Sequence, residues 1–481
     1  MNDQTLDAAS FREQAHKLVD WMADYLEGVE SYPVKSQVKA REILEQLPLN
    51  PPQEAESMDA IFADFQRIIL PGITHWQSPK FFSYFPANSS YASLLGEMLT
   101  ATLGAQCMIW ETSPAAAELE ERVMEWLAQM IGLPSYFSGV IQSTASDGTL
   151  IALLTAREKA SNFQVNEIGL RQHPQYRVYA SGQTHSSIEK AVKIAGLGRE
   201  NCVYVAADQE YAMDPESLQK ALQADLQAGL KPLCVIATLG TTSSTAIDPL
   251  EPIAKICEEY NVWLHVDAAY AGNALILPEY RHWIEGIERV DSFVFNPHKW
   301  LFTNFDCTAY YVRSEEYLIR TFEILPEYLK TRHDKVVNNY RDWGIALGRR
   351  FRALKLWFVL RNFGVEGLQA KLRHHMQLGQ WLKEQVEEHP DFELLAPVPL
   401  NLVCFRYRPG QALTEGQLTQ INQQIVLQLN DSGKIYLTHT KLNGKYTIRL
   451  VAGQTQVEQR HVEEAWQLIQ DTAKAIAHEM D

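Results

Sequence analysis

The amino-acid sequence predicts an α/β protein with a mainly parallel central sheet and helices on both of its faces. Three short apolar runs, residues 233–238, 262–267 and 292–296, alternate with longer stretches of helical periodicity. Each run is apolar almost throughout and ends in polar or small residues, as a strand buried on both faces does. Ligands of open α/β sheets bind beyond the carboxyl ends of the strands, so the residues that follow these runs are candidates for a functional site.

The length and composition indicate a globular chain of more than one domain. At roughly 150 residues per domain, the 481 residues suggest two or three domains. Hydrophobic residues make up 46% and charged residues 21%, which is ordinary for a globular protein and opposes a disordered or repeat-dominated chain. We divide the chain into an N-terminal helical segment at 1–85, a large α/β domain at 86–360 and a small α+β domain at 361–481.

The N-terminal segment is predicted to begin with an amphipathic helix. Apolar residues recur at helical spacing from Phe11 to Leu26, so the apolar face of this helix must pack on something. A proline-rich connection at 47–52 then interrupts helix formation, because proline removes an amide donor and fixes φ.

The C-terminal domain is predicted to combine two helices with a few strands. Helical patterns at 365–388 and 461–478 flank a strand at 400–407 and a hairpin or meander at 435–451. The Asn-Gly pair at 443–444 is a strong signal for a two-residue hairpin turn.

The charge balance and the cysteines limit the kinds of partner. A net charge of −16 opposes broad binding to a phosphate backbone, which needs clustered Lys and Arg, so we expect no nucleic-acid partner. The cysteines are far apart and form no CxxC pair, which indicates neither a zinc site nor a disulfide framework, and we expect no metal. They are Cys107, Cys202, Cys234, Cys257, Cys307 and Cys404. The sequence shows no signal peptide and no membrane helix, so we expect a soluble cytoplasmic protein.

The clearest chemical feature is Lys299, which follows a buried strand in the run Asn-Pro-His-Lys. Taken alone, a lysine in a loop is far more often solvated than reactive. Asp267 changes this balance, because it ends the preceding predicted strand about one βα unit earlier and can lie at the same sheet edge. A lysine that forms a Schiff base and a carboxylate for a pyridinium nitrogen are what pyridoxal 5′-phosphate requires. The small residues Ala268 and Ala269 would let a flat ring lie close, although ordinary strand packing explains them equally well.

A phosphate anchor is predicted at 139–148, before a helical run at 150–160. Small and hydroxyl residues at a helix N-terminus present free amides to an anion. Plain N-capping by Ser146 or Asp147 is an equally good interpretation of the same residues. Neither a GxGxxG nor a GxxxxGK[ST] motif is present, which leaves nucleotide binding with little support.

Two further polar positions follow predicted strands. His185 comes after the run 176–180 and begins a predicted helix, where it could stack on a cofactor ring opposite Ala269. A lone histidine is more often structural. Thr242 lies in a loop after the strand that ends at Thr238; it could bond near the ring or simply belong to a hydroxyl-rich turn.

The sequence resembles the group II pyridoxal-phosphate-dependent decarboxylases, and within them the aromatic-L-amino-acid decarboxylases, from Phe11 to about Gly367. The motifs that carry the resemblance stand in the family's order: PGITHW at 71–76, FFSYFP at 81–86, ATLGTT at 237–242, VDAAYAG at 266–272, NPHKW at 296–300 and LGRRFR at 347–352. The resemblance implies the aspartate aminotransferase-like fold of pyridoxal-phosphate enzymes, fold type I. It also implies an intertwined homodimer with sites at the subunit interface, which would cover the apolar face of the first helix.

The resemblance also assigns roles to individual residues. It implies that Lys299 holds the internal aldimine, that Asp267 pairs with the pyridine nitrogen and that His185 stacks on the ring. Tyr328 matches the tyrosine of a loop that closes over the neighbouring subunit's site and returns a proton to Cα after CO₂ has left a quinonoid. The cofactor-binding residues that it implies are Thr144, Ala145, Ser146, His185, Thr242, Asp267, Ala269, Asn296, His298 and Lys299.

An aromatic L-amino acid is the expected substrate, and an arylalkylamine and CO₂ are the expected products. The substrate-binding positions that the resemblance implies are Trp76, Tyr84, Phe85, Pro86, Ala87, Gln106, Met108 and Gly348. Aromatic walls favour an aromatic side chain, and Gly348 leaves room for a large ring. Ala87, Gln106 and Met108 depart from the residues of animal relatives, so tryptophan, tyrosine, phenylalanine and DOPA all remain open.

Three alternatives are weighed against this interpretation. The first is an aromatic aldehyde synthase, which is disfavoured because the sequence retains both Tyr328 and His185. The second is a decarboxylase of an acidic or diamino substrate, which is disfavoured by the aromatic residues Trp76 and Phe85. The third is a catalytically silent scaffold, which would be expected to have lost Lys299 or Asp267.

Overall fold

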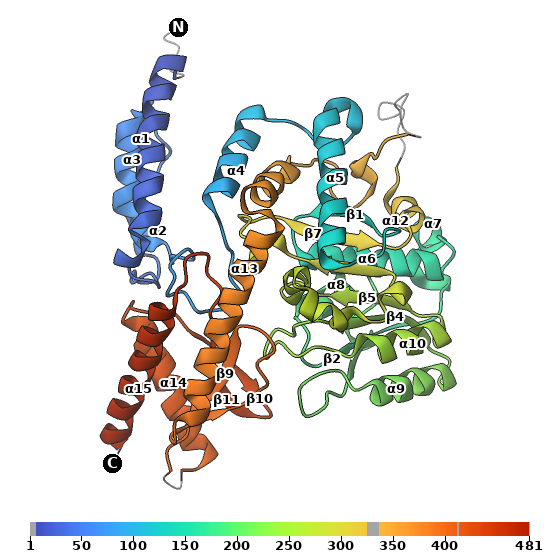
Figure 1. The fold of residues 1–481 in the computed structure, drawn as a ribbon. Helices are drawn as coiled ribbons and strands as arrows, with labels where there is room; N and C mark the ends of the chain where they lie inside the picture. Colours follow the sequence, from blue (N-terminus) through green and yellow to red (C-terminus); the bar gives the residue numbers. More distant parts are fainter. Residues whose placement is uncertain (1–5, 325–335, 411–412, 481) are drawn as a thin grey trace. The chain divides into compact units, whose positions relative to one another are not determined.

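The computed structural model describes residues 6–324, 336–410 and 413–480. Two compact units divide the chain (Figure 1). The large unit comprises residues 87–380 and 396–404, and the small unit comprises residues 1–86, 381–395 and 405–481. The C-terminal segments thus group with the N-terminal segment, which sequence periodicity alone does not reveal. The division into three domains at 85 and 360 stays a prediction.

The large unit contains a seven-stranded sheet with strand order β1-β7-β6-β5-β4-β2-β3. Strands β6, β5, β4, β2 and β3 are parallel, whereas β7 is antiparallel to both β6 and β1. This mixed but mainly parallel sheet confirms the predicted fold class. The strands are β1 Ser138–Gln142, β2 Tyr176–Ser181, β3 Cys202–Val205, β4 Lys231–Thr238, β5 Trp263–Asp267, β6 Ser292–Phe295 and β7 Thr308–Val312.

The large unit also contains helices. They are α4 Tyr91–Leu103, α5 Pro114–Ile131, α6 Ala145–Ala160, α7 Val165–Ile168, α8 Ser187–Ile194, α9 Pro215–Gln227, α10 Leu250–Tyr260, α11 Pro297–Trp300 and α12 Glu315–Phe322. Among them, α5, α6, α9 and α10 contact strands of this sheet. Helices α6 and α8 contact each other, as do α9 and α10 (Figure 1).

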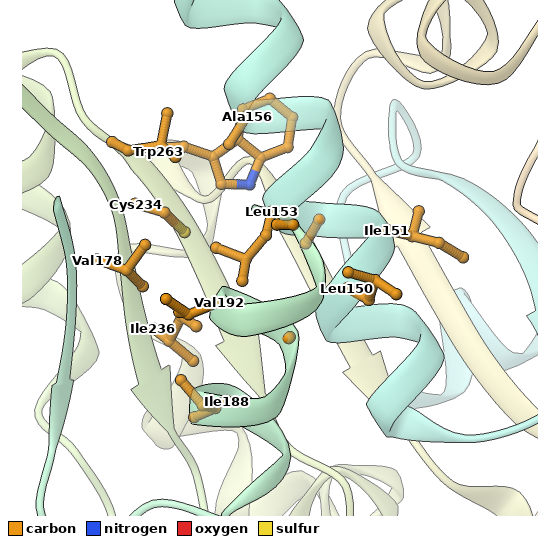
Figure 2. Close-up of a cluster of buried hydrophobic side chains, with 14 of the residues drawn as sticks. Leu150, Ile151, Leu153, Ala156, Val178, Ile188, Val192, Cys234, Ile236 and Trp263 are labelled. Carbon is orange, nitrogen blue, oxygen red and sulfur yellow. The ribbon is translucent and has the colours of Figure 1, made fainter. Parts of the chain in front are cut away.

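The core of the large unit lies between α6, α8 and the sheet (Figure 2). Leu153 of α6 and Val192 of α8 meet Ile236 of β4 in this cluster. Strand β4 is buried from Pro232 to Thr238, so its alternate side chains must pack on both faces of the sheet. A strand enclosed in this way reads as a continuous apolar run, which is why the sequence pattern located it.

The small unit combines helices with most of a four-stranded sheet of order β10-β11-β9-β8, in which residues 402–404 of β9 count with the large unit. Its strands are β8 Phe392–Leu394, β9 Leu402–Tyr407, β10 Thr438–Leu442 and β11 Lys445–Val451, and its helices are α1 Ala8–Glu27, α2 Glu42–Gln46, α3 Met58–Asp64, α14 Glu415–Asp431 and α15 Gln459–Met480. The predicted hairpin is present: β10 and β11 are antiparallel and joined through Asn443 and Gly444, whose φ angles are 48° and 79°. Positive φ at both positions is what a two-residue turn of this kind requires.

Helix α13, Arg352–Glu388, is longer than the predicted helix at 365–388. It is interrupted at Gly364, where φ is 64° and ψ is 170°, so the predicted helix corresponds to the part after this break. The part before the break was missed by the sequence pattern. None of the helices in the described ranges has the length and hydropathy of a bilayer-spanning helix.

Candidate active site

The carboxyl ends of β5 and β6 bring Asp267 and Lys299 to the same edge of the sheet. The two strands are parallel, with Asp267 opposite Val294, and Lys299 lies in the short helix α11 that follows β6. Burial lowers the pKa of Lys299, and the nearby Asp267 carboxylate opposes this shift. Burial likewise raises the pKa of Asp267, against the influence of Lys299. A lowered pKa increases the share of a lysine that is the neutral amine, which is its nucleophilic form.

The Asp267 carboxylate has a defined orientation. Its Oδ1 accepts a hydrogen bond of 3.0 Å from the backbone N–H of Ala269, and the residue is buried. The second carboxylate oxygen, Oδ2, is not engaged by that bond. This arrangement suits a carboxylate that pairs with a protonated ring nitrogen.

His185 lies in the connection between β2 and α8, and the helix itself begins at Ser187. Its Nδ1 accepts a hydrogen bond of 3.1 Å from the N–H of Ser187. Although His185 is exposed, local desolvation and the charge of Lys299 lower its pKa, while Asp267 opposes them. A neutral ring with Nδ1 as an acceptor carries its proton on Nε2. We call Asp267, Lys299 and His185 the lysine edge.

The turn that carries Lys299 is fixed by its backbone. The N–H of Lys299 donates to the carbonyl of Asn296 at 2.9 Å, and Asn88 Nδ2 donates to the carbonyl of Lys299 at 3.0 Å. His298 Nδ1 accepts from the N–H of Cys307 at 3.0 Å, and burial together with Lys299 lowers the pKa of His298 to about 3. His298 is therefore neutral, and the contact that the structure shows for it is structural.

Helix α6 begins where the phosphate anchor was predicted. Thr144 is the N-cap residue: its hydroxyl accepts from the N–H of Asp147, and the Asp147 carboxylate accepts from the N–H of Thr144. The alternative that placed the cap at Ser146 or Asp147 is thus wrong, because Asp147 is the third helical residue and completes a capping box with Thr144. The N–H groups of Ala145 and Ser146 have no acceptor within the described ranges and are available to an anion.

The residues of this edge fit pyridoxal 5′-phosphate. Lys299 supplies an amine, Asp267 a buried carboxylate, and α6 two unused amides at its N-terminus. Thr242 and Ala269 follow the ends of β4 and β5. All of these residues belong to the large unit, and the predicted cofactor contacts are thus distributed over one sheet edge.

The aromatic wall lies in the small unit. We use this name for Trp76, Tyr84 and Phe85. The rings of Trp76 and Tyr84 stack with centroids 5.7 Å apart, and both side chains are exposed, to 37% and 48%. The guanidinium of Arg449 lies 5.5 Å from the ring of Phe85. Pro86, the fourth predicted position of this group, is buried.

The remaining predicted substrate positions belong to the large unit. Gln106 Oε1 accepts a hydrogen bond of 2.7 Å from the N–H of Arg349, and a Cβ atom on Gly348 would lie 3.4 Å from Gln106 Nε2. The carbonyl of Met108 accepts from the N–H of Arg341 at 2.8 Å. The structure thus brings Gln106 beside Gly348. Tyr328 lies outside the described residues.

Sequence reasoning missed a polar network around the anchor and the lysine turn. It consists of Ser143, Asp306, Thr308 and Arg352. The motif at 347–352 contains Arg352, but no spacing rule assigns a role to a single arginine. Ser143, Asp306 and Thr308 come together only in the folded structure, so the sequence does not show that they are neighbours.

Comparison with known proteins identifies close relatives. The model of the family described as "Pyridoxal-dependent decarboxylase conserved domain" matches residues 41–408. Tryptophan decarboxylase 2 from Oryza sativa is 44% identical, with 99% of this chain and 97% of the relative covered. Phenylacetaldehyde synthase from Arabidopsis thaliana is also 44% identical, with 98% of each covered. The crystal structure of Oryza sativa TDC with PLP and tryptamine is similar with a TM-score of 0.95 and 38% identity, covering 98% of this chain and 99% of that one.

Proposed function

The chain belongs to the pyridoxal-dependent decarboxylase family, and on that premise we propose that it converts an aromatic L-amino acid into the corresponding arylalkylamine and CO₂. The enzyme is a lyase with pyridoxal 5′-phosphate as its cofactor. The observation that carries the proposal is the pairing of Lys299 with the buried Asp267 at adjoining strand ends, together with a full-length relative that is a tryptophan decarboxylase.

The cofactor, when bound, supplies an electron sink for the electron pair that the departing carboxylate leaves behind. We propose that the Lys299 amine would hold the cofactor covalently. Asp267 would hold a proton on the ring nitrogen, and His185 would contact the ring. Ala145 and Ser146 bind the phosphate through their amides, with Thr144, Asn296, Thr242 and Ala269 as further contacts. Tyr328 is proposed as the residue that delivers a proton to the substrate Cα.

The aromatic wall supports an aromatic substrate. Trp76 and Tyr84 expose stacked rings, which favour a flat aromatic side chain by burial and by ring–ring contact. We propose Trp76, Tyr84, Phe85, Pro86, Ala87, Gln106, Met108 and Gly348 as the substrate-binding set. Glycine at 348 beside Gln106 leaves room for a large ring.

A panel of amino acids tests this proposal. Purified enzyme loaded with pyridoxal 5′-phosphate is incubated with tryptophan, tyrosine, phenylalanine, DOPA, glutamate and 2,4-diaminobutyrate, and CO₂ and amine are measured. We expect equal amounts of CO₂ and amine from at least one aromatic substrate. Turnover of glutamate or diaminobutyrate alone would overturn the proposed substrate class, and a chain without bound cofactor or turnover would indicate a scaffold.

A second candidate, an aromatic aldehyde synthase, is favoured by one observation: the 44% identity to a phenylacetaldehyde synthase. The same panel separates the two activities. An aldehyde synthase releases ammonia and hydrogen peroxide in near-stoichiometric yield with CO₂, whereas a decarboxylase releases neither. The retention of Tyr328 and His185 favours the decarboxylase.

We propose that the enzyme works as a homodimer, with an amino acid as its small-molecule partner. Helix α1 has no buried residue, and α4 exposes Tyr91, Leu95, Leu99 and Leu103 along one face. An exposed apolar helix face supports the proposal of an interface at this place. The double variant Leu95→Asp, Leu99→Asp should sediment as a monomer in analytical ultracentrifugation. The control Leu226→Asp, at an exposed position of α9, should leave the sedimentation of the dimer unchanged.

A cytoplasmic location is also proposed. All six cysteines are buried as free thiols, which accords with a reducing compartment. Secretion of the native protein with a cleaved leader would contradict this location.

A further inference from the structure

Residues 306–308 contact the turn that carries Lys299, the residue before the N-cap of α6, and Arg352 at the start of α13. The carboxylate of Asp306 accepts from Arg352, and the N–H of Cys307 donates to His298. The hydroxyl of Thr308 lies 2.8 Å from Oδ1 of Asn296 and 3.2 Å from the carbonyl of Ser143. This segment therefore connects the lysine turn, which begins at Asn296, to the residue that precedes the N-cap of α6.

Arg352 contacts both Asp306 and Ser143. Its Nε and Nη2 donate to Oδ2 of Asp306 at 3.1 and 2.9 Å, and Nη2 also donates to the hydroxyl of Ser143 at 3.0 Å. The Arg352 side chain is only 13% exposed. A planar guanidinium held by a carboxylate has little rotational freedom, so it fixes the position of the Ser143 hydroxyl.

Ser143 is the residue through which this network acts on the anchor. It stands directly before Thr144, the N-cap, and two residues before the first unused amide of α6. Its hydroxyl accepts from Arg352, and its carbonyl lies 3.2 Å from the Thr308 hydroxyl, whose single proton is shared between this carbonyl and Oδ1 of Asn296. Any shift of Ser143 would therefore move the amides of Ala145 and Ser146 relative to Lys299.

Arg350 provides a natural comparison within the same motif. Its Nη1 lies 3.3 Å from Oδ1 of Asp306, but it has no contact with Ser143 in the described part of the chain and its side chain is 51% exposed. Arg350 also pairs with Glu97. The two arginines share the partner Asp306 and differ in the link to the anchor.

We propose that Arg352 is a positioning residue for cofactor binding: through Ser143 and Asp306 it holds the phosphate-binding end of α6 in register with the lysine turn. The proposal rests on the proposed function, because it takes the N-terminus of α6 as the phosphate anchor. It adds a residue that the cofactor contacts themselves do not include.

The test compares pyridoxal 5′-phosphate with pyridoxal, which lacks the phosphate. Dissociation constants of both are measured by equilibrium dialysis for the wild-type chain and for Arg352→Gln, without substrate. We expect Arg352→Gln to bind pyridoxal 5′-phosphate about tenfold to a hundredfold more weakly, the scale of a lost charge-assisted hydrogen bond, and to bind pyridoxal within about twofold of wild type. Equal loss for both ligands would show a general structural effect and overturn the proposal.

Two further variants locate the effect. Ser143→Ala removes the hydroxyl that Arg352 holds, and we expect it to reproduce most of the phosphate-specific loss. The double variant should then lose little more than Arg352→Gln alone, because both changes break one connection. A full additive loss would mean that Arg352 acts independently of Ser143 and would overturn the proposed route.

Arg350→Gln is the matched control, since it removes an equal charge that also faces Asp306. We expect it to retain the wild-type preference for the phosphorylated ligand. A loss as large as that of Arg352→Gln would assign the effect to the charge near Asp306 and contradict the role of Ser143. If the wild-type chain itself bound no pyridoxal 5′-phosphate, the proposed function would fail instead, so the two failures are distinguishable.

Discussion

The lysine edge of the large unit and the aromatic wall of the small unit differ in how their side chains are held. Asp267 is buried and oriented by a backbone N–H, and the turn of Lys299 is tied to Asn296 and Asn88. Trp76 and Tyr84, by contrast, expose 37% and 48% of their surface and contact each other by stacking.

This difference matches the two proposed roles: catalysis at the lysine edge and selection of the substrate at the aromatic wall. Charges that must act on one bond need fixed positions and a low dielectric, which buried strand ends provide. Recognition of an aromatic side chain needs apolar area more than exact placement, since burial is non-directional. Substitutions at the lysine edge should therefore abolish turnover, whereas substitutions in the aromatic wall should change which substrate is preferred.

The largest effect is expected for Lys299→Ala. It removes the amine that we propose as the covalent anchor of the cofactor, and we expect CO₂ release to fall by about 10⁴-fold or more. The visible colour of the bound cofactor should change as well. Lys255→Ala, at an exposed lysine of α10, is the control and should remain active. Wild-type turnover without Lys299 would refute the assignment of the lysine edge.

Asp267→Asn should have the next largest effect. The amide keeps the shape and can still accept from the N–H of Ala269, but it loses the negative charge that holds a proton on the ring nitrogen. We expect kcat to fall by about 10²- to 10³-fold, the cost of a lost preorganised charge interaction. Steady-state kinetics with the best substrate of the panel measure it. A change of less than threefold would mean that Asp267 does not face the ring.

Trp76→Ala should have a smaller and more selective effect. We expect kcat/KM for an aromatic substrate to fall by about tenfold, which corresponds to one lost aromatic contact. Binding of the cofactor should be unchanged, because Trp76 is not part of the lysine edge. Kinetics with two substrates of different ring size measure the preference. Equal losses of kcat for every substrate would contradict a role in selection.

The smallest effect is expected in the stability of the small unit. Arg460 lowers the pKa of Glu30 to about 2, with His461 acting in the same direction. Because the folded-state pKa lies below the unfolded value of about 4.5, this carboxylate stabilises the fold above pH 4.5 and loses its contribution as the pH falls toward 2. The Glu30 side chain is 32% exposed, so we expect only about 1 kcal/mol.

Thermal unfolding of Glu30→Gln at several pH values tests this expectation. The melting temperature should lie below wild type at pH 7, and the difference should shrink between pH 5 and pH 3. A difference that grows on acidification would contradict the sign of the pKa shift.

Local sequence patterns determined much of this protein. The apolar runs located β4, β5 and β6, and the positive φ angles of Asn443 and Gly444 were foreseeable because that dipeptide tolerates them. The identity of the lysine and aspartate, and their spacing of about one βα unit, sufficed to predict that they meet at one edge. These features depend on short stretches of chain whose periodicity and chemistry are read directly.

Tertiary structure decided the rest. The first part of α13 and its break at Gly364 were not predicted, and the cap of α6 was placed at the wrong residue. The network of Arg352, Asp306, Thr308 and Ser143 joins residues up to 209 positions apart. The grouping of the C-terminal segments with residues 1–86 is likewise a product of folding. Such contacts depend on packing between distant segments, and no local pattern records which distant partner a polar side chain will meet.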